Sequence, residues 1–421
     1  MSVRLFGLVP GVLATVGLAR HAEAQVLTRE SYGTSCQPAS AGSRDPFLSA
    51  DGRWVLFSST AQNLVPDDAG STYDVFLRDR WSWTTSCISV DPAGHPGNGD
   101  SVGWSEITPD LRYVAFQSRA SNLVAGDTNG VDDVFVRDRL LGATVRVSVA
   151  TGGAQADAYS GEPSMSDDGR FVAFDSDASN LVPGDPGGQP DIFLHDRDPD
   201  GNGAFDEGNG TTICLSVDAA TGNPANASSI GPQISADGRY VAYASWSHAI
   251  VPGMPGGVFL WDRQSGTTIG ISVDSAGTPA TGLSYRASIS DDGAHVSFSS
   301  FDPNLVTGDA NGAWDIFVRH WQAGVTELVS VGTDYHGSSS SRISGDGRIV
   351  AFETEARLVP ADTDFSYDVY LRDLQTGTTS LPTGPAIGNC LSPAISSDGN
   401  SVGWIASLGM LPGDMNDLDD I

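Results

Sequence analysis

The segment from residue 196 to 207 shows the strongest sign of chemistry in this sequence. It reads DRDPDGNGAFDE and places carboxylate and amide oxygens on alternate residues around glycine turns. A hard cation such as Ca2+ takes about six to eight oxygen ligands from loops of this kind. We therefore predict a calcium loop with these ligands: Asp196, Asp198, Asp200, Asn202, Asp206 and Glu207.

Two registers fit this loop. One begins at Asp196 and has the length of an EF-hand loop, with Gly201 at its sixth place. The other begins at Asp198, and it is favoured because Asp196 also belongs to a recurring strand ending. An acidic surface loop without a metal is the alternative interpretation.

A second acidic pattern, D-x-N-G-x-x-D, occurs twice, with partial versions at 362–368 and 414–416. Its oxygens could bind a metal, or they could order the loop as Asx turns. The residues in the two full copies are Asp127, Asn129, Asp133, Asp309, Asn311 and Asp315.

A third set of polar and aromatic residues is expected at the centre of the molecule. These residues precede, by two or four positions, the Ser or Thr that ends the first strand of each repeat described below. If those strands border a central channel, the side chains could bind a sugar or peptide, and the carboxylates could act in glycoside chemistry. Packing between repeats is the alternative. The set is Asp45, Trp104, Glu106, Glu162, Gln233, Arg286 and Arg342.

Motifs for covalent or metal-dependent catalysis are largely missing. The sequence has no lysine, which excludes Schiff-base and Ser–Lys chemistry, and it has no H-E-x-x-H motif. The four cysteines have no C-x-x-C spacing. We therefore predict no catalytic residue by name.

The elements that must position these side chains come from one repeat. A segment such as SDDGRFVAF recurs seven times, and Asp-Gly between alternating apolar runs predicts a tight hairpin. Later runs in each copy, such as 133–138 and 143–148, predict two more strands. The seven hairpin aspartates are Asp51, Asp110, Asp168, Asp237, Asp292, Asp346 and Asp398.

Four short strands cannot bury both faces alone, so neighbouring copies must stack around an axis. We predict an all-β, seven-bladed β-propeller of four-stranded antiparallel blades, with six or eight blades as alternatives. We expect residues 26–31 to close the ring against the incomplete last repeat. Residues 25–421 would form a single propeller domain with a calcium-type insertion at 196–209.

The seven S-x-D-G-R-x-V-A-F hairpins, over residues 45 to 421, resemble the TolB-like β-propeller repeat of exported bacterial proteins. This resemblance implies a propeller that binds other molecules or serves as the non-catalytic half of an enzyme. We expect no hydrolase domain after the repeats, unlike in the peptidases of the wider group.

Residues 1–24 have the pattern of a signal peptide, with Arg4, an apolar run and the cleavage site Ala22-Glu23-Ala24. We therefore predict export to the periplasm or the extracellular space, without a membrane span. The formal net charge of −30 disfavours nucleic acid and anionic membranes as partners, and it favours cations.

Together these features predict a secreted, calcium-stabilised propeller that binds a protein or carbohydrate ligand. A propeller glycoside hydrolase or lyase that uses channel carboxylates is the alternative. The sequence leaves open whether the protein is an enzyme.

Overall fold

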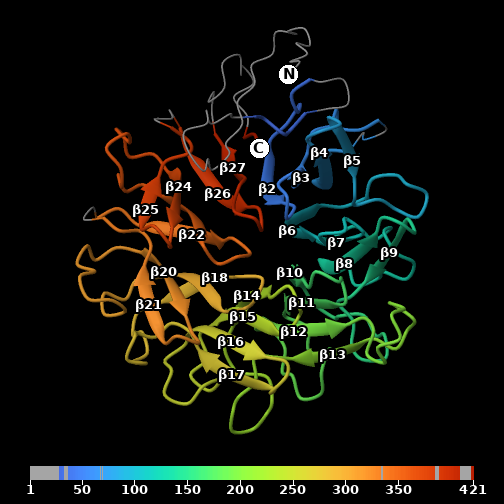
Figure 1. The fold of residues 1–421 in the computed structure, drawn as a ribbon. Coiled ribbons are helices and arrows are strands. Elements are labelled where there is room, and N and C mark those ends of the chain that lie inside the picture. The colour runs from blue at the N-terminus through green and yellow to red at the C-terminus, as the bar shows by residue number, and fades with distance from the viewer. Residues whose placement is uncertain are drawn as a thin grey trace.

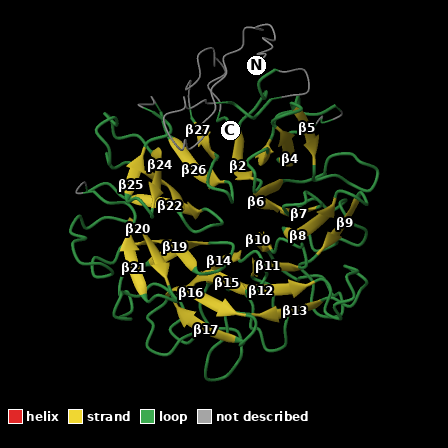
Figure 2. Cartoon of the chain, viewed as in Figure 1, coloured by secondary structure: helices red, strands yellow, loops and turns green. Residues whose placement is uncertain are grey.

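The chain folds into antiparallel β-sheets arranged around a central axis (Figure 1). This computed structural model describes residues 28–32, 37–66, 68, 70–332, 335–384, 388–407 and 419–421. The predicted signal peptide lies outside the described residues. Figure 2 shows strands joined by loops and turns. Among the described residues, no helix is long and apolar enough to cross a membrane.

Six sheets have four strands each, and each sheet pairs its strands in chain order. We name the strands A to D, with strand A nearest the axis (Figure 1). Blade 1 contains β2 (Ser43–Leu48), β3 (Trp54–Ser59), β4 (Asp74–Asp79) and β5 (Thr84–Cys87). Blade 2 contains β6 (Ser101–Ile107), β7 (Tyr113–Ser118), β8 (Asp133–Asp138) and β9 (Ala143–Arg146). Blade 3 contains β10 (Ser160–Met165), β11 (Phe171–Ser176), β12 (Asp191–Asp196) and β13 (Thr211–Cys214).

The second half of the chain repeats this arrangement. Blade 4 contains β14 (Ser229–Ile234), β15 (Tyr240–Ser245), β16 (Gly257–Asp262) and β17 (Thr267–Gly270). Blade 5 contains β18 (Ser284–Ile289), β19 (His295–Ser300), β20 (Asp315–His320) and β21 (Val325–Leu328). Blade 6 contains β22 (Ser338–Ile343), β23 (Ile349–Thr354), β24 (Asp368–Asp373) and β25 (Thr378–Ser380).

The prediction of seven four-stranded blades is wrong, because the described residues form six. The seventh repeat contributes only a two-stranded sheet, β26 (Cys390–Ile395) with β27 (Val402–Ala406). This sheet lies between blade 6 and blade 1 (Figure 1). The described residues that follow it make one isolated bridge, between Ala406 and Asp420, instead of a third strand. The two ends of the chain meet here, where the Glu30 N–H donates to the Ile421 carbonyl at 2.6 Å.

Each blade begins with the predicted hairpin, and its turn is Asp-Gly except in blade 2, where Leu111 takes the place of the glycine with φ of 66°. In blade 1, Asp51 accepts hydrogen bonds from the Ser49 hydroxyl at 2.7 Å and the Arg53 N–H at 3.0 Å. Gly52 has φ of 66°, a backbone conformation that favours glycine. The Arg53 side chain then binds both carboxylate oxygens of Asp79, at the end of strand C.

This Arg–Asp pair joins strand B to strand C in five of the six blades. Blade 5 is the exception, because Ala294 and His320 occupy the two places. There the Nδ1 atoms of His295 and His320 lie 2.6 Å apart. The five pairs are Arg53–Asp79, Arg112–Asp138, Arg170–Asp196, Arg239–Asp262 and Arg348–Asp373.

The hydrophobic core lies between adjacent blades. One buried cluster joins Leu56 and Leu77 of blade 1 to Phe116 and Phe135 of blade 2. Similar clusters join later pairs of blades, such as 4 to 5 and 5 to 6. Because each sheet buries its faces against its neighbours, the ring holds the innermost strands at fixed places around the axis.

Candidate functional site

A β-bulge interrupts every innermost strand. In β2 the pairing with β3 shifts between Arg44 and Phe47, and the same shift recurs in β6, β10, β14, β18, β22 and β26. A bulge leaves a residue unpaired and re-aims its side chain. Six of these strands carry a bulge residue in the left-handed region: Asp45, Glu162, Gly231, Arg286, Ser340 and Ser392.

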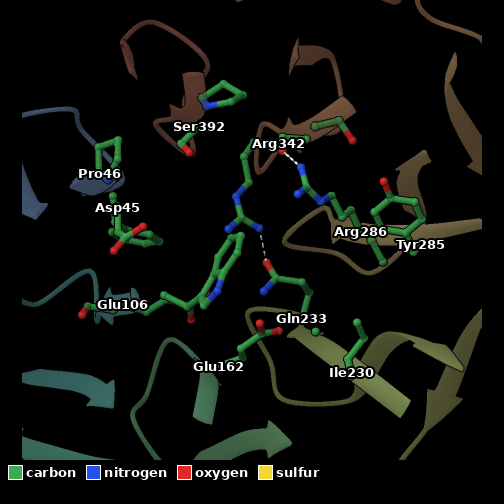
Figure 3. A pocket seen from close by; sticks show the side chains of 18 of the residues that line it. Asp45, Pro46, Glu106, Glu162, Ile230, Gln233, Tyr285, Arg286, Arg342 and Ser392 are labelled. Atoms are coloured by element: carbon green, nitrogen blue, oxygen red, sulfur yellow. Dashed lines mark hydrogen bonds between the residues drawn. The ribbon is translucent and has the colours of Figure 1, made fainter. Parts of the chain in front are cut away.

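The bulges surround a cavity of about 440 Å3 on the axis (Figure 3). Residues from all seven innermost strands line it. Its volume lies in the range of about 300 to 1,000 Å3 that is usual for small-ligand sites. The structure brings together here the full predicted channel set: Asp45, Trp104, Glu106, Glu162, Gln233, Arg286 and Arg342.

Arg342 lies at the centre of this cavity (Figure 3). Its Nη1 donates to Gln233 Oε1 at 2.9 Å, which joins strand A of blade 6 to strand A of blade 4. The guanidinium carbon is 4.8 Å from the centroid of the Trp104 ring, a cation–π contact with blade 2. Three blades therefore hold this positive charge in one position.

Arg286 extends from the bulge of blade 5. Its Nη1 donates to the Ser340 hydroxyl and lies 3.8 Å from Glu353 Oε1. Glu353 is itself fixed, since its Oε2 accepts the Ser392 N–H at 2.7 Å. The Arg286 side chain is 46% exposed, so a ligand in the cavity can reach it.

Two carboxyl groups face these arginines. Glu106 Oε2 accepts the Met165 N–H at 2.7 Å and the Ser164 hydroxyl at 3.2 Å. Burial raises the pKa of Glu106 to about 7, against the lowering effects of the Met165 N–H and of Arg342. Burial also raises the pKa of Glu162, and Arg342 opposes this effect. The cavity therefore holds permanent positive charge beside carboxyl groups that retain protons to higher pH than usual.

Aromatic side chains that the sequence analysis missed also line the cavity. Trp246 follows strand B of blade 4, and Tyr285 precedes the bulge residue of blade 5. Trp246 is 42% exposed. The sequence analysis considered only the residues two and four positions before the end of each first strand, so it missed Tyr285. It missed Trp246 because this residue reaches the cavity from a loop. A Trp directly after strand B, where most of the repeats have a polar residue, is the sequence signal that could have found it.

The predicted calcium loop divides into two parts. Asp198, Asp200 and Asn202 lie close together, with Asp198 Oδ1 accepting the Asn202 N–H at 3.0 Å and Asp198 Oδ2 accepting the Gly203 N–H at 2.9 Å. The Asn202 amide also donates to Glu207 at 2.8 Å.

The other two predicted ligands of this loop bind arginines. Asp196 pairs with Arg170 at 2.7 Å, and Asp206 pairs with Arg197 at 2.5 Å. Calcium binding by the loop stays a prediction, with Asp198, Asp200, Asn202 and Glu207 as the acids and amide that have no such arginine pair in the described structure.

The D-x-N-G-x-x-D segments form the loops between strands B and C, here called B–C loops. In blade 2, Asn129 donates to Asp133 Oδ2 at 2.8 Å, and Arg146 lies 3.2 Å from Asp127. In blade 5, Asp315 begins strand C, and the Asn311 side-chain oxygen accepts the Ala313 N–H at 3.0 Å. Asp309 of this loop is partly buried, and burial raises its pKa. The partial copy at 414–416 lies outside the described residues.

Two G-x-S-x-G pentapeptides occur, at 99–103 and 399–403. A nucleophile elbow needs a strand–turn–helix arrangement with an exposed serine. Ser101 instead begins strand β6, is fully buried and shares a hydrogen bond of 2.8 Å with Ser118. Ser401 follows an Asp-Gly turn and bonds to Ser396. Neither serine has the geometry of a nucleophile.

Two solved oligogalacturonate lyases have folds similar to this chain. One, determined in complex with manganese, aligns with a TM-score of 0.57 and 11% identity over 93% of this chain and 94% of that chain. The other, from Vibrio parahaemolyticus, aligns with a TM-score of 0.56 and 12% identity over 97% and 96%. Identity this low shows a shared propeller fold and does not transfer the activity.

The solved neighbours also include TolB from Acinetobacter baumannii, with a TM-score of 0.40 and 16% identity over 86% of this chain and 76% of that chain. This TM-score is too low to support any conclusion about a relationship to TolB itself. No protein-family model and no curated protein sequence matches the chain. The comparisons therefore support the propeller fold, and the choice between a binding protein and an enzyme depends on the cavity.

Proposed function

We propose that this protein is an exported binding propeller whose axial cavity takes a polar ligand carrying a carboxylate. The observation that carries the proposal is the Arg342 guanidinium, which three blades hold at the cavity centre. Arg286 offers a second, more exposed guanidinium in the same cavity. An arginine can bind both oxygens of a carboxylate through parallel hydrogen bonds.

The rest of the cavity suits a carbohydrate or peptide that bears this carboxylate. Trp104 and Trp246 are 45% and 42% exposed, so their ring faces can pack against a sugar or an apolar side chain. Gln233 and the Glu106 and Glu162 carboxyl groups can accept or donate hydrogen bonds to hydroxyl or amide groups. The ligand class is thus a short acidic oligosaccharide or a peptide end.

The test is a comparison of Arg342→Met with Arg119→Met, a control arginine that does not line the cavity and whose side chain is 61% exposed. Titration calorimetry would use short oligogalacturonates, peptides with a free C-terminus, and their neutral counterparts. A hydrogen bond to a charged group contributes about 1.5 to 3 kcal/mol, so Arg342→Met should weaken carboxylate binding about 10- to 150-fold. Arg119→Met should bind like wild type. Equal affinity of the two variants, or no preference for carboxylates, would contradict the proposal.

A second candidate function is β-elimination of a uronate polysaccharide, and Glu106 is the observation that favours it. A base works best when its pKa lies near the working pH, and the pKa of Glu106 is raised to about 7 by burial. In such a step Glu106 would take the C5 proton, the C4–O bond would break and the leaving oxygen would be protonated. The assay is the ultraviolet absorbance of the new double bond. Activity that is lost in Glu106→Gln would support the lyase, and no activity on acidic polysaccharides would exclude it.

We further infer that residues 1–24 direct export and are removed, which leaves a propeller domain over residues 25–421, and that the loop at 196–209 binds Ca2+. The length and charge pattern of the N-terminus support the first inference. The clustered oxygens of Asp198, Asp200 and Asn202 support the second. The mass of the mature protein in the periplasmic or culture fraction tests the processing.

A further inference from the structure

An aspartate begins strand C in every four-stranded blade except blade 4, and a hydroxyl of the outer edge holds it. In blade 5 the Ser330 hydroxyl donates to Asp315 Oδ1 at 2.5 Å, and in blade 6 the Thr383 hydroxyl donates to Asp368 Oδ1 at 3.0 Å. These aspartates are buried, so their second oxygen needs a partner other than water. The other pairs of this kind are Asp74–Ser89, Asp133–Ser148, Asp191–Ser216 and, where the chain ends meet, Asp420–Ser31.

In blade 2 an arginine supplies that partner. Arg146 lies two residues before Ser148, and its Nη1 is 3.2 Å from Asp127 Oδ1 and 3.4 Å from Asp133 Oδ2. Both carboxylates are almost fully buried, with side-chain exposures of 3% and 0%. The same place in the sequence pattern, two residues before Ser31, holds Arg29, which pairs with Asp420. A guanidinium therefore neutralises the buried acids at two places in the ring.

Blade 4 lacks both the acids and the cation. Gly257 begins its strand C, and Gly270 stands at the place of Arg146. The Met254 side chain is buried and fills the space, since a Cβ added to Gly270 would lie 2.7 Å from its sulfur. Where the acids are absent, an apolar side chain occupies the site.

Blades 5 and 6 keep the acids but have leucines, Leu328 and Leu381, at the place of Arg146. Asp315 is 2% exposed, and its Oδ2 is buried without a hydrogen-bond partner among the described residues. In blade 6, single oxygens of Asp362, Asp364 and Asp368 all lie within 4.8 Å of one another.

Asp362 and Asp368 are buried and Asp364 is partly buried, and carboxylates this close repel each other unless a cation or a proton compensates them. Among the described residues no arginine forms an ion pair with the acids of these two loops, and Arg357 instead lies over the Phe365 ring of the blade 6 loop. The repeats thus fall into three groups: blade 2 has the acids and an arginine, blade 4 has neither, and blades 1, 3, 5 and 6 have acids without an arginine at that place. Asp74 Oδ2 of blade 1 is also buried without a hydrogen-bond partner among the described residues.

We propose that the B–C loops of blades 5 and 6 each bind one Ca2+ ion, which takes the role that Arg146 has in blade 2. Carboxylate and amide oxygens in a flexible loop are the ligands that Ca2+ prefers. In the B–C loops of blades 1 and 3, a glycine (Gly70 or Gly187) stands where blade 5 has Asn311 and blade 6 has Asp364. These two loops therefore provide one ligand fewer. The ligands are Asp309, Asn311 and Asp315 in blade 5 and Asp362, Asp364 and Asp368 in blade 6.

The test uses the full chain and counts bound Ca2+ after equilibrium dialysis, together with Tm in Ca2+ and in EGTA. Ca2+ bound only to the native state must raise Tm. Leu381→Arg copies the blade 2 arrangement, so this variant should bind one ion fewer than wild type and should melt above wild type in EGTA. Asp368→Asn should also bind one ion fewer. Asp127→Asn is the matched control, because Arg146 already serves that loop, and its ion count should equal that of wild type.

Wild type and all variants contain the same loop at 198–207, so any ion bound there cancels when the numbers of bound Ca2+ ions are compared. If Leu381→Arg and Asp368→Asn bind as many ions as wild type, or if Ca2+ leaves the Tm of wild type unchanged, the proposal is overturned. An Asp127→Asn variant that loses an ion would also overturn the assignment of the ions to blades 5 and 6.

Discussion

Replacing Glu106 with Gln should change how the stability of the protein depends on pH. Glu106 lines the cavity, and Gln has nearly the same shape and can still accept the Met165 N–H through its side-chain oxygen. The substitution therefore removes an ionisable group with little change in packing. The free energies of unfolding of the two proteins should differ only at pH values at which Glu106 loses its proton.

The sign follows from the direction of the pKa shift. Burial raises the pKa of Glu106 from 4.5 to about 7, so between these values the native state keeps a proton that the unfolded state has lost. The wild-type free energy of unfolding must then fall as pH rises from about 4.5 to 7, and it must stay level above 7. The difference between the two pKa values, at about 1.36 kcal/mol per unit, gives an upper limit of about 3 kcal/mol.

The assay is urea unfolding of both proteins in EGTA at pH 4.5, 6, 7 and 8. We expect equal stability at pH 4.5 and an advantage for Glu106→Gln that grows to between about 1 and 3 kcal/mol at pH 8. The measurement at pH 4.5 serves as the internal control for packing. A variant that is less stable than wild type at pH 8 would refute the reasoning, because it would mean that folding lowers the pKa of Glu106 instead of raising it.

Two further predictions concern the frame of the blade. In blade 4 the hydrogen bonds from Arg239 lower the pKa of Asp262 to about 2, so the pair stabilises the fold above about pH 4 and is lost as pH falls toward 2. Asp262→Asn should cost about 1 kcal/mol in urea unfolding at pH 7 and nothing near pH 2, and an equal cost at both would contradict this. Gly238→Ala should lower Tm and cost more than about 1 kcal/mol, because φ is +67° and the new Cβ would lie 2.5 Å from the Phe171 ring. A variant that melts like wild type would contradict the turn geometry.

Much of the fold could be predicted from local sequence. Asp-Gly between alternating apolar runs requires a hairpin, and the apolar faces that result can only be buried by stacking on equivalent sheets. The number of complete blades could not be predicted in the same way. Seven hairpin motifs occur, but whether a hairpin gains two outer strands depends on the segments that follow it. After the seventh hairpin, the described residues 419–421 make only one isolated bridge, between Ala406 and Asp420.

The cavity residues could be found because repeats place equivalent residues at equivalent distances from the axis. Counting back from the end of each first strand reached the bulge residue in each case, although the bulge itself was not predicted. Proline directly after that residue, as in Asp45-Pro46 and Glu162-Pro163, was the available signal, because proline inside a sheet occurs mainly at bulges and edges.

The calcium loop shows why contacts distant in sequence limit such predictions. Read alone, the loop offers six oxygen-bearing side chains. In the structure Asp196 binds Arg170, which is 26 residues away, and Asp206 turns back to Arg197. The partner of Asp196 is the residue just before strand B of its blade, and only the hairpin register places that arginine close to the carboxylate.

One electrostatic rule connects these places. The chain has no lysine, and its carboxylates outnumber its arginines by more than two to one. A guanidinium can bind two carboxylate oxygens at once, so arginine is efficient where acids are buried, as at Asp79, Asp133 and Asp138. With so few arginines, some buried acids must be neutralised in another way. A proton suffices for a single carboxyl such as Glu106, whose pKa is raised to about 7. For three carboxylates within 4.8 Å, as in blade 6, one proton still leaves two charges, and the Ca2+ ion that we propose for this loop would balance them at neutral pH.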